Sequence, residues 1–379
     1  MLSSCSHIKP NSPTLKKIKN ENIYNLLFPD VEADKNKEMI FLQQYNFSNI
    51  QLPYTVLSNV NFNGSKLDGI NLTQSNINNI NFANTKLKNI DFTDSILTNI
   101  NFNNAELTNI IFDNTKLINV NFNGARINKT KLNNSLLFNS TIQKSVIADS
   151  SLTNITFNRV NLRNITFYYS TLSNVKADHL DLKRSNFTGT KIENSSFIGS
   201  NFEHANFTSS KINNSSFNSS HMTNVKGKNS KWENINFSST TGIGMHIEKS
   251  SITHSNMSKA DLRESRFLET NFYHTNLTNC NLEFANFSYA KMKKTNLTNS
   301  NLSRATFKRA DLSNARINST QAKWTSFLMS NLSNTSFSGS DIHKADFRGA
   351  NFNNTNFNQT QHFNNAIGLN KIVPPSSLK

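Results

Sequence analysis

The sequence contains almost no cysteine and no long apolar run. Its two cysteines, Cys5 and Cys280, cannot form a disulfide framework, so a reducing compartment is allowed though not required. No stretch of 18 apolar residues is present, and we therefore predict no membrane-spanning helix. The opening stretch MLSSCSHIKPNSPTLKKIKN also lacks an apolar run as long as a secretory signal needs, so we expect no cleaved signal peptide.

Acidic residues are scarce as well, with 24 Asp and Glu against 40 Lys and Arg, which gives a net charge of +16. This surplus permits attraction to phosphates, acidic proteins or anionic lipid, but it does not bear on the fold. Apolar residues make up 36% and charged residues 17%, and most of the remainder is Asn, Ser and Thr. The composition is too polar for a conventional two-layer core, yet 29 Phe residues are too many for a disordered chain.

Large apolar residues recur every five positions, as in INFANTKLKNIDFTDSILTNINF at residues 80–102. The column of positions whose numbers end in 2 or 7, from Phe47 to Phe357, has 63 members and holds 24 of the 29 Phe residues. The members that are not large and apolar are Ala177, Gly227, Gly242 and Ala322. Because the register is never lost, residues 47–357 form one structural unit.

A second column lies two residues before the first and holds mostly Ser, Thr and Ala, with Ile or Val in the N-terminal half. Residues two apart on extended backbone share a face, so both columns point inward. A helix would rotate successive members by about 140°, and a flat strand would send them to alternate faces. A chain that turns a corner after each block satisfies the pattern. Four blocks then close a coil of about 20 residues, and coils stack at roughly 4.8 Å.

The positions between these columns are rich in Asn, Asp, Ser and Gly, as in FNGSKLDG and FSGSD. These side chains bond to turn backbone and tolerate unusual φ and ψ, so they suit corners. Stacked Asn residues are expected to form side-chain ladders between coils.

The blocks ADLRE (260–264), ANFSY (285–289), ADLSN (310–314), ADFRG (345–349) and ANFNN (350–354) resemble the pentapeptide-repeat motif, which reads roughly A-(D/N)-(L/F)-x-x. The resemblance implies an all-β fold, a right-handed quadrilateral parallel β-helix. The 63 blocks, at four blocks per coil, give about 16 coils, and the spacing of stacked strands then gives a rod of roughly 75 Å. Ile or Val replaces Ala at every second block between Val60 and Val120. These residues fall on two opposite walls, with Ser, Thr or Ala on the other pair through residue 125, so we expect the coil to be somewhat rectangular there.

Four segments are predicted. Residues 1–29 form a flexible leader and a possible secretion signal, and residues 30–45 form a short helix that caps the first coil. Residues 46–360 form the β-helix. Residues 361–379 form a C-terminal cap and tail that place Phe363, Ile367, Leu369 and Ile372 over the last coil.

Catalytic motifs are absent from the sequence: there is no GxxxxGK[ST], HExxH, paired CxxC or GxSxG. A regular rod also offers no cleft for convergent groups, so we expect no enzyme activity, no cofactor and no metal. The TGIGM stretch at 241–245 is interpreted as a bulged coil, because Gly242 falls where a core residue belongs. His254 and His274 fall on adjacent coils, and we interpret them as surface histidines and not as metal ligands.

One outward column combines aromatic residues and cations: Glu264, Phe284, Arg304, Trp324 and Lys344. Exposed apolar groups rimmed by charge indicate a partner-binding surface. The alternative is that basic walls are solvated and that Trp324 turns inward beside Ala322. Tyr168 and Tyr169 give a weaker version of the same signal. The partner-binding candidates are Phe284, Tyr289, Lys293, Lys294, Arg304, Lys308, Arg309 and Trp324.

The leader and the rod together resemble the pentapeptide-repeat type III secreted effectors of enteric Gram-negative bacteria. That resemblance implies a non-enzymatic interaction rod, secreted into a host cell or otherwise in the bacterial cytoplasm, that binds host proteins or membrane-associated partners. An end-to-end homodimer is a further expectation. The alternatives are a DNA-mimicking topoisomerase protector, which the charge of +16 disfavours, weak binding of nucleic acid or anionic membrane without sequence specificity, and a structural or immunity-type rod.

Overall fold

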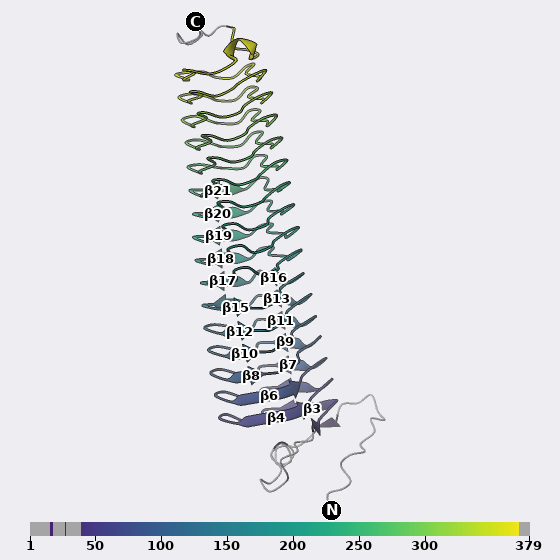
Figure 1. The fold of residues 1–379 in the computed structure, drawn as a ribbon. Helices are drawn as coiled ribbons and strands as arrows, with labels where there is room; N and C mark the ends of the chain where they lie inside the picture. The colour runs from purple at the N-terminus through teal and green to yellow at the C-terminus, as the bar shows by residue number, and fades with distance from the viewer. Residues whose placement is uncertain (1–15, 18–26, 28–38, 371–379) are drawn as a thin grey trace, which may run out of the picture.

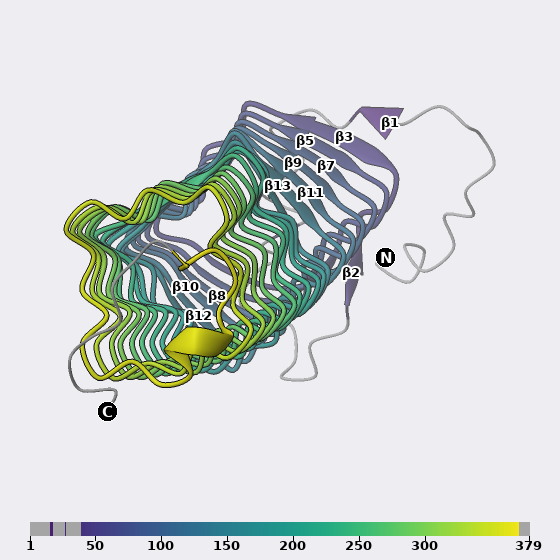
Figure 2. The same cartoon turned by 90° about the horizontal axis from the view of Figure 1, so that it is seen from above.

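The computed structural model describes residues 16–17, 27 and 39–370. From residue 39 onward the chain winds into a rod of stacked coils that ends at residues 361–370 (Figure 1). Seen along its axis, each coil lies over the one before it around a common interior (Figure 2). The fold is therefore the predicted all-β parallel β-solenoid. No helix among the described residues is long and apolar enough to cross a membrane.

Three parallel sheets run along the walls of the rod. The first contains β1 (Lys16–Lys17), β3 (Tyr45–Ser48), β5 (Lys66–Asp68), β7 (Lys86–Lys88), β9 (Glu106–Thr108), β11 (Arg126–Asn128), β13 (Val146–Ala148) and β16 (Thr166–Tyr168). The second contains β2 (Ile40–Phe41), β4 (Val56–Asn61), β6 (Asn76–Asn81), β8 (Ile96–Thr98), β10 (Lys116–Ile118), β12 (Leu136–Phe138) and β15 (Thr156–Asn158). The third contains β14 (Ser151–Thr153), β17 (Thr171–Ser173), β18 (Lys191–Glu193), β19 (Lys211–Asn213), β20 (Lys231–Glu233) and β21 (Ser251–Thr253).

Along the coils, each paired residue meets the residue four blocks later in the chain, as the five-residue period predicts; the pairs at the two ends of the rod, Lys16↔Tyr45 and Asp346↔Ile367, depart from this offset. This register begins at Ile40↔Val60 and continues to Asp341↔Gln361 through strands and single bridges. Up to β16 the strands lie mainly on two opposite walls, and the other two walls carry mostly single bridges until β14. The two pairs of walls therefore differ in secondary structure over this half of the rod.

The corners lie at positions whose numbers end in 4 or 9, where nearly every residue has a positive φ, as in Asn84 at 57° and Asn99 at 55°. Asn is the commonest residue at these positions, because its short polar side chain tolerates the left-handed conformation. Where the residue after the corner is small, the chain forms a tight turn with its own hydrogen bond. One example is the turn at residues 82–85, in which the Thr85 N–H donates to the Phe82 carbonyl at 3.3 Å. At the next corner the residue after the turn is the β-branched Ile90, and the extended backbone that leads to this corner forms β7.

Asn side chains also form the predicted ladders between coils. Along one corner column the Nδ2 of Asn114 donates to Asp94 at 2.9 Å, Asn134 donates to Asn114 at 3.0 Å, and Asn154 donates to Asn134 at 2.8 Å. Each of these corner amides is thus bonded to the coil before it. This accounts for the abundance of Asn in a chain whose corners require positive φ.

The interior is filled by the large apolar column. Phe62, Phe82, Phe102 and Phe122 stack with successive ring centroids 5.3, 5.2 and 4.9 Å apart and with interplanar angles of 4°, 7° and 9°. The small column beside it contributes hydrogen bonds as well as space. Ser95 Oγ donates to the Leu72 carbonyl of the preceding coil at 2.7 Å, and Thr115 Oγ1 donates in the same way to Phe92 at 2.8 Å. These buried hydroxyls are therefore satisfied.

The Gly242 coil is not bulged, so that interpretation was wrong. Thr241 pairs with Asp261 in the ordinary register, and the Gly242 N–H donates to the Asp261 carbonyl at 2.7 Å. Met245 occupies the small column and is fully buried, and a Cβ added to Gly242 would lie 2.5 Å from its sulfur. The two columns have exchanged large and small residues, which conserves volume and keeps the register.

The N-terminal end of the rod differs from the predicted cap. Residues 28–38 lie outside the described part of the chain, but Ile40–Phe41 is a strand paired with Val60–Asn61, so a helix reaching residue 45 was wrong. Lys16–Lys17, expected in a leader without regular structure, pairs with Tyr45–Asn46 as β1. The N-terminal edges of β3 and β4 are thus occupied by backbone pairing with β1 and β2.

At the C-terminal end, Phe363 and Leu369 are buried as predicted, and Phe363 begins the 3₁₀ helix η2 (Phe363–Asn365). Ile367 is exposed, which corrects the prediction, because its backbone pairs with Asp346 and directs its side chain outward. Ile372 lies outside the described residues.

The exchange at Gly242 predicts strong coupling between two substitutions. Gly242→Leu alone should destabilise by about 1–3 kcal/mol through overpacking, and Met245→Ser alone by about 2–5 kcal/mol through an unfilled cavity. The double variant restores a large residue at 242 and a small one at 245. Its loss of unfolding free energy should therefore be well below the sum of the losses of the two single variants. Denaturant unfolding of the four proteins measures the coupling free energy, and additive losses would contradict the exchange.

Candidate functional site

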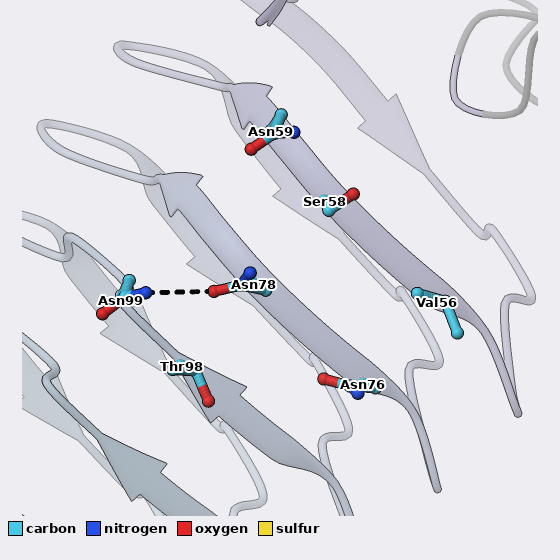
Figure 3. A pocket seen from close by; sticks show the side chains of 7 residues that line it. All are labelled: Val56, Ser58, Asn59, Asn76, Asn78, Thr98 and Asn99. Atoms are coloured by element: carbon cyan, nitrogen blue, oxygen red, sulfur yellow. Dashed lines mark hydrogen bonds between the residues drawn. The ribbon is translucent and has the colours of Figure 1, made fainter. Parts of the chain in front are cut away.

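The interior is closed by side chains, so any binding groups lie on the outer walls. A shallow hollow lies on the outer face of β4, β6 and β8 (Figure 3). Its lining consists of Val56, Ser58, Asn59, Asn76, Asn78, Thr98 and Asn99. This lining offers amides and hydroxyls but no carboxylate, histidine, thiol or cation, so it lacks an acid, a base or an activated nucleophile.

Two other groups have chemistry that could matter. The rings of His254 and His274 stack with centroids 5.7 Å apart, and His254 lies 3.7 Å from Glu233. No set of three His, Cys, Asp or Glu side chains among the described residues is placed to hold a metal ion. Burial raises the pKa of the Cys280 thiol to about 12, which keeps it protonated and unreactive near neutral pH.

A stronger signal comes from bulky residues at corner positions. Phe284, Tyr289 and Trp324 have φ of 60°, 60° and 59°, in columns where Asn and Gly would adopt this conformation with less strain. Left-handed backbone is disfavoured for large side chains. Because nearly every corner of the rod has this φ, the conformation belongs to the fold, and the large exposed rings at these corners are what make the three residues candidates for binding.

One corner column alternates aromatic residues and cations. Arg304 lies over the Phe284 ring at 5.2 Å, and further along the column Lys344 lies over the Trp324 ring at 4.3 Å. Phe284 and Trp324 are each about half exposed. Trp324 does not turn inward to fill the space beside Ala322, because its corner φ of 59° directs the side chain outward.

The neighbouring corner column repeats the arrangement. Arg309 lies over the Tyr289 ring at 5.8 Å, and Met329 follows in the next coil with half of its surface exposed. Lys308 and Leu328 lie beside this column on the wall between the two corners. We refer to these residues together as the aromatic–cation wall, which comprises Phe284, Tyr289, Arg304, Lys308, Arg309, Trp324, Leu328, Met329 and Lys344.

The cations of this wall have no acidic partners among the described residues. Arg304, Lys308, Arg309 and Lys344 form no ion pair there, whereas nearby Arg263, Lys323 and Arg348 pair with Asp261, Asp341 and Asp346 at 2.7, 3.3 and 2.8 Å. The wall therefore presents unneutralised positive charge held against aromatic rings.

Two predicted site residues lie apart from this wall. Lys293 and Lys294 are on the next wall, and Lys294 lies over Tyr273 at 6.0 Å, beside His254 and His274. Tyr168 and Tyr169, whose ring centroids are 6.4 Å apart, belong to an earlier part of the rod. The eight candidates are therefore one group of six with Lys293 and Lys294 on a separate face.

The sequence columns missed two contacts of the same kind. Lys294 packs on Tyr273 of the preceding coil, and Arg159 packs on Phe138 of its own preceding coil at 5.9 Å. In both pairs the cation lies one position beyond the column partner of the aromatic residue. Reading the sequence in columns compares residues that are 20 apart, and the two members of each of these pairs are 21 apart. An aromatic residue just before a corner, with a cation at the corner one coil later, would have revealed both pairs.

The repeat region matches two family models. One, described as the pentapeptide repeat region, matches residues 41–112 and 245–317. The other, described as pentapeptide repeats in eight copies, matches residues 95–134, 185–224 and 330–361. No curated protein sequence matches the chain.

The solved structures that match this chain have low identity to it and low TM-scores. A trypsin-treated variant of QnrB1, a plasmid-mediated fluoroquinolone resistance protein, is 21% identical over 51% of this chain and 91% of its own, with a TM-score of 0.34. HetL, involved in heterocyst differentiation regulation in the cyanobacterium Nostoc, is 17% identical over 86% and 92%, with a TM-score of 0.15. A tailspike protein of an E. coli bacteriophage is 10% identical over 87% and 70%, with a TM-score of 0.28.

If Trp324 is kept for binding, replacing it should not harm the fold. Trp324→Asn relieves left-handed strain of about 1–2 kcal/mol and removes one exposed cation–π contact worth about 0.5–1 kcal/mol. Denaturant unfolding should therefore show unchanged or slightly higher stability. A loss above about 2 kcal/mol would identify Trp324 as a structural residue.

Proposed function

Because the chain belongs to the pentapeptide-repeat family, we propose that it is a non-enzymatic interaction rod that binds partner proteins through its outer walls. The observation that carries the proposal is the aromatic–cation wall, where half-exposed rings lie beside cations that form no ion pair with any described residue. Exposed apolar groups with neighbouring charge are typical of protein interfaces, in which Trp, Tyr and Arg supply much of the binding energy.

The rest of the rod supports this assignment. Its interior is packed with stacked Phe rings, and the hollow on β4, β6 and β8 has no catalytic group. Neighbouring coils pair in one register over residues 40–361, so the walls form a rigid platform. Rigid presentation lowers the entropy lost when a partner binds.

We further propose that the rod is a type III secreted effector that acts on host proteins or membrane-associated partners inside a host cell. The support is the sequence resemblance together with a leader, residues 1–29, that has few acids. Topoisomerase protection by DNA mimicry requires an acidic surface, and the net charge of +16 opposes it.

The delivery proposal predicts that residues 1–45 carry an export signal. A reporter enzyme fused to residues 1–45 should leave secretion-competent bacteria, and the same fusion should be retained in a strain that lacks the type III apparatus. A fusion to residues 46–90 serves as the matched control and should stay inside. Retention of the 1–45 fusion in the competent strain would remove the delivery proposal without affecting the interaction rod.

The binding proposal predicts that the aromatic–cation wall decides partner capture. The variant Trp324→Ala, Arg304→Ala, Arg309→Ala should lose most of the host protein that the wild type recovers from cell lysate, as identified by mass spectrometry. The matched control, Tyr54→Ala, Lys211→Ala, Lys231→Ala, removes one exposed ring and two cations that form no ion pair with a described residue, elsewhere on the rod. Equal recovery with both variants would show that the wall is an ordinary solvated surface.

A further inference from the structure

Successive coils of the aromatic–cation wall differ in chemistry. The first coil carries the rings of Phe284 and Tyr289, the next carries Arg304, Lys308 and Arg309, and the third carries Trp324, Leu328 and Met329. A row of three cations thus lies between two apolar rows. None of these cations has an acidic partner among residues 39–370, and the row has no acid of its own.

Both arginines in this row lie beside an aromatic ring of the preceding coil. The guanidinium carbon of Arg304 is 5.2 Å from the centroid of the Phe284 ring, and that of Arg309 is 5.8 Å from the centroid of the Tyr289 ring. Neither donates a side-chain hydrogen bond to a described residue. Their N–H edges are therefore available for carboxylates, which accept two parallel hydrogen bonds from a guanidinium.

Between the two corner columns runs a strip of short side chains, Asn286, Thr306 and Ser326, one in each coil. Long residues border this strip on both sides. A segment lying along the strip, parallel to the rod axis, would meet an apolar coil, a cationic coil and another apolar coil in turn.

The spacing of the coils selects the conformation of such a segment. Two coil steps cover about 9.6 Å at roughly 4.8 Å per coil, and two helical turns cover about 10.8 Å. Two same-face steps of an extended strand cover about 13 Å, which fits less well. We propose that the aromatic–cation wall binds an α-helical peptide segment that carries apolar, acidic and apolar side chains on successive turns of one face. This inference rests on the proposed interaction function and deepens it.

Two other ligand classes fit the arrangement less well. A surface that binds a bilayer has apolar side chains at its centre, which insert into the membrane, and cations around them. On this wall the cations lie between the apolar rows. Single-stranded nucleic acid binds by stacking bases on open aromatic faces, whereas Arg304, Arg309 and Lys344 each lie over one face of the Phe284, Tyr289 and Trp324 rings and compete for it.

A display library tests the proposal with the full-length protein. The library is a set of helical peptides, each about five turns long, in which the positions i, i+3, i+4, i+7 and i+11 of one face are randomised. Selection should enrich an acidic residue one turn from apolar residues on both sides. No enrichment, or enrichment of peptides without acids, would overturn the proposal.

Charge exchange supplies the second readout. Arg304→Glu, Arg309→Glu should weaken the selected peptide at least tenfold in a fluorescence polarisation titration, and a peptide with Lys in place of its acidic residue should recover binding to this variant. Lys211→Glu, Lys231→Glu makes the same charge change on another wall and should leave affinity unchanged. Equal weakening by both double variants, or no recovery, would show general charge attraction and would contradict a specific site.

The same variants separate this inference from the proposed function. Vesicles of phosphatidylserine and phosphatidylcholine, and a thymidine oligonucleotide, are titrated alongside the peptide. Tighter binding to either than to the selected peptide, lost with Arg304→Glu, Arg309→Glu, would overturn the helical ligand. If peptide selection fails while capture from lysate still depends on the wall, the interaction rod stands and the ligand assignment falls.

Discussion

Parallel pairing between equivalent positions of successive coils is the constraint on which the rest of the rod depends. It places one Phe ring over another, as in the Phe82–Phe102 stack at 5.2 Å, and places each corner beside the equivalent corner of the preceding coil. It also determines the surface, because any side chain on an outer wall has its column neighbours four blocks away in the chain. Interior packing, Asn ladders and cation–aromatic stacks are therefore consequences of one register.

Much of this fold could be predicted from the sequence because both inward columns have a strict period. The Phe82–Phe102 stack and the ladder from Asp94 to Asn154 follow directly from that period. Gly242 misled the prediction because volume is conserved over the pair of columns and not at each position, so Met245 could replace the missing side chain. The ends were less predictable, since Ile40 and Ile367 pair by backbone hydrogen bonds that no side-chain period records.

The candidate site was predictable to the extent that it follows columns. Phe284, Arg304 and Trp324 were expected together and lie together, whereas Lys294 belongs with Tyr273 on another wall. The exposure of Trp324 depends on its left-handed corner, which the spacing of the repeat does not reveal. In this scaffold a corner favours Asn or Gly, so backbone conformation alone does not account for an aromatic ring such as Trp324 at a corner.

Distances between spin labels on one corner column test the central claim of a uniform register of four blocks per coil. Asn114, Asn214 and Asn314 are exposed corner residues in one column, and each can be replaced in pairs by a labelled cysteine after Cys5→Ser. The account predicts about 24 Å for the pairs 114–214 and 214–314, and about 48 Å for 114–314, because five coils of roughly 4.8 Å separate neighbours. A 114–314 distance close to either shorter one would contradict it.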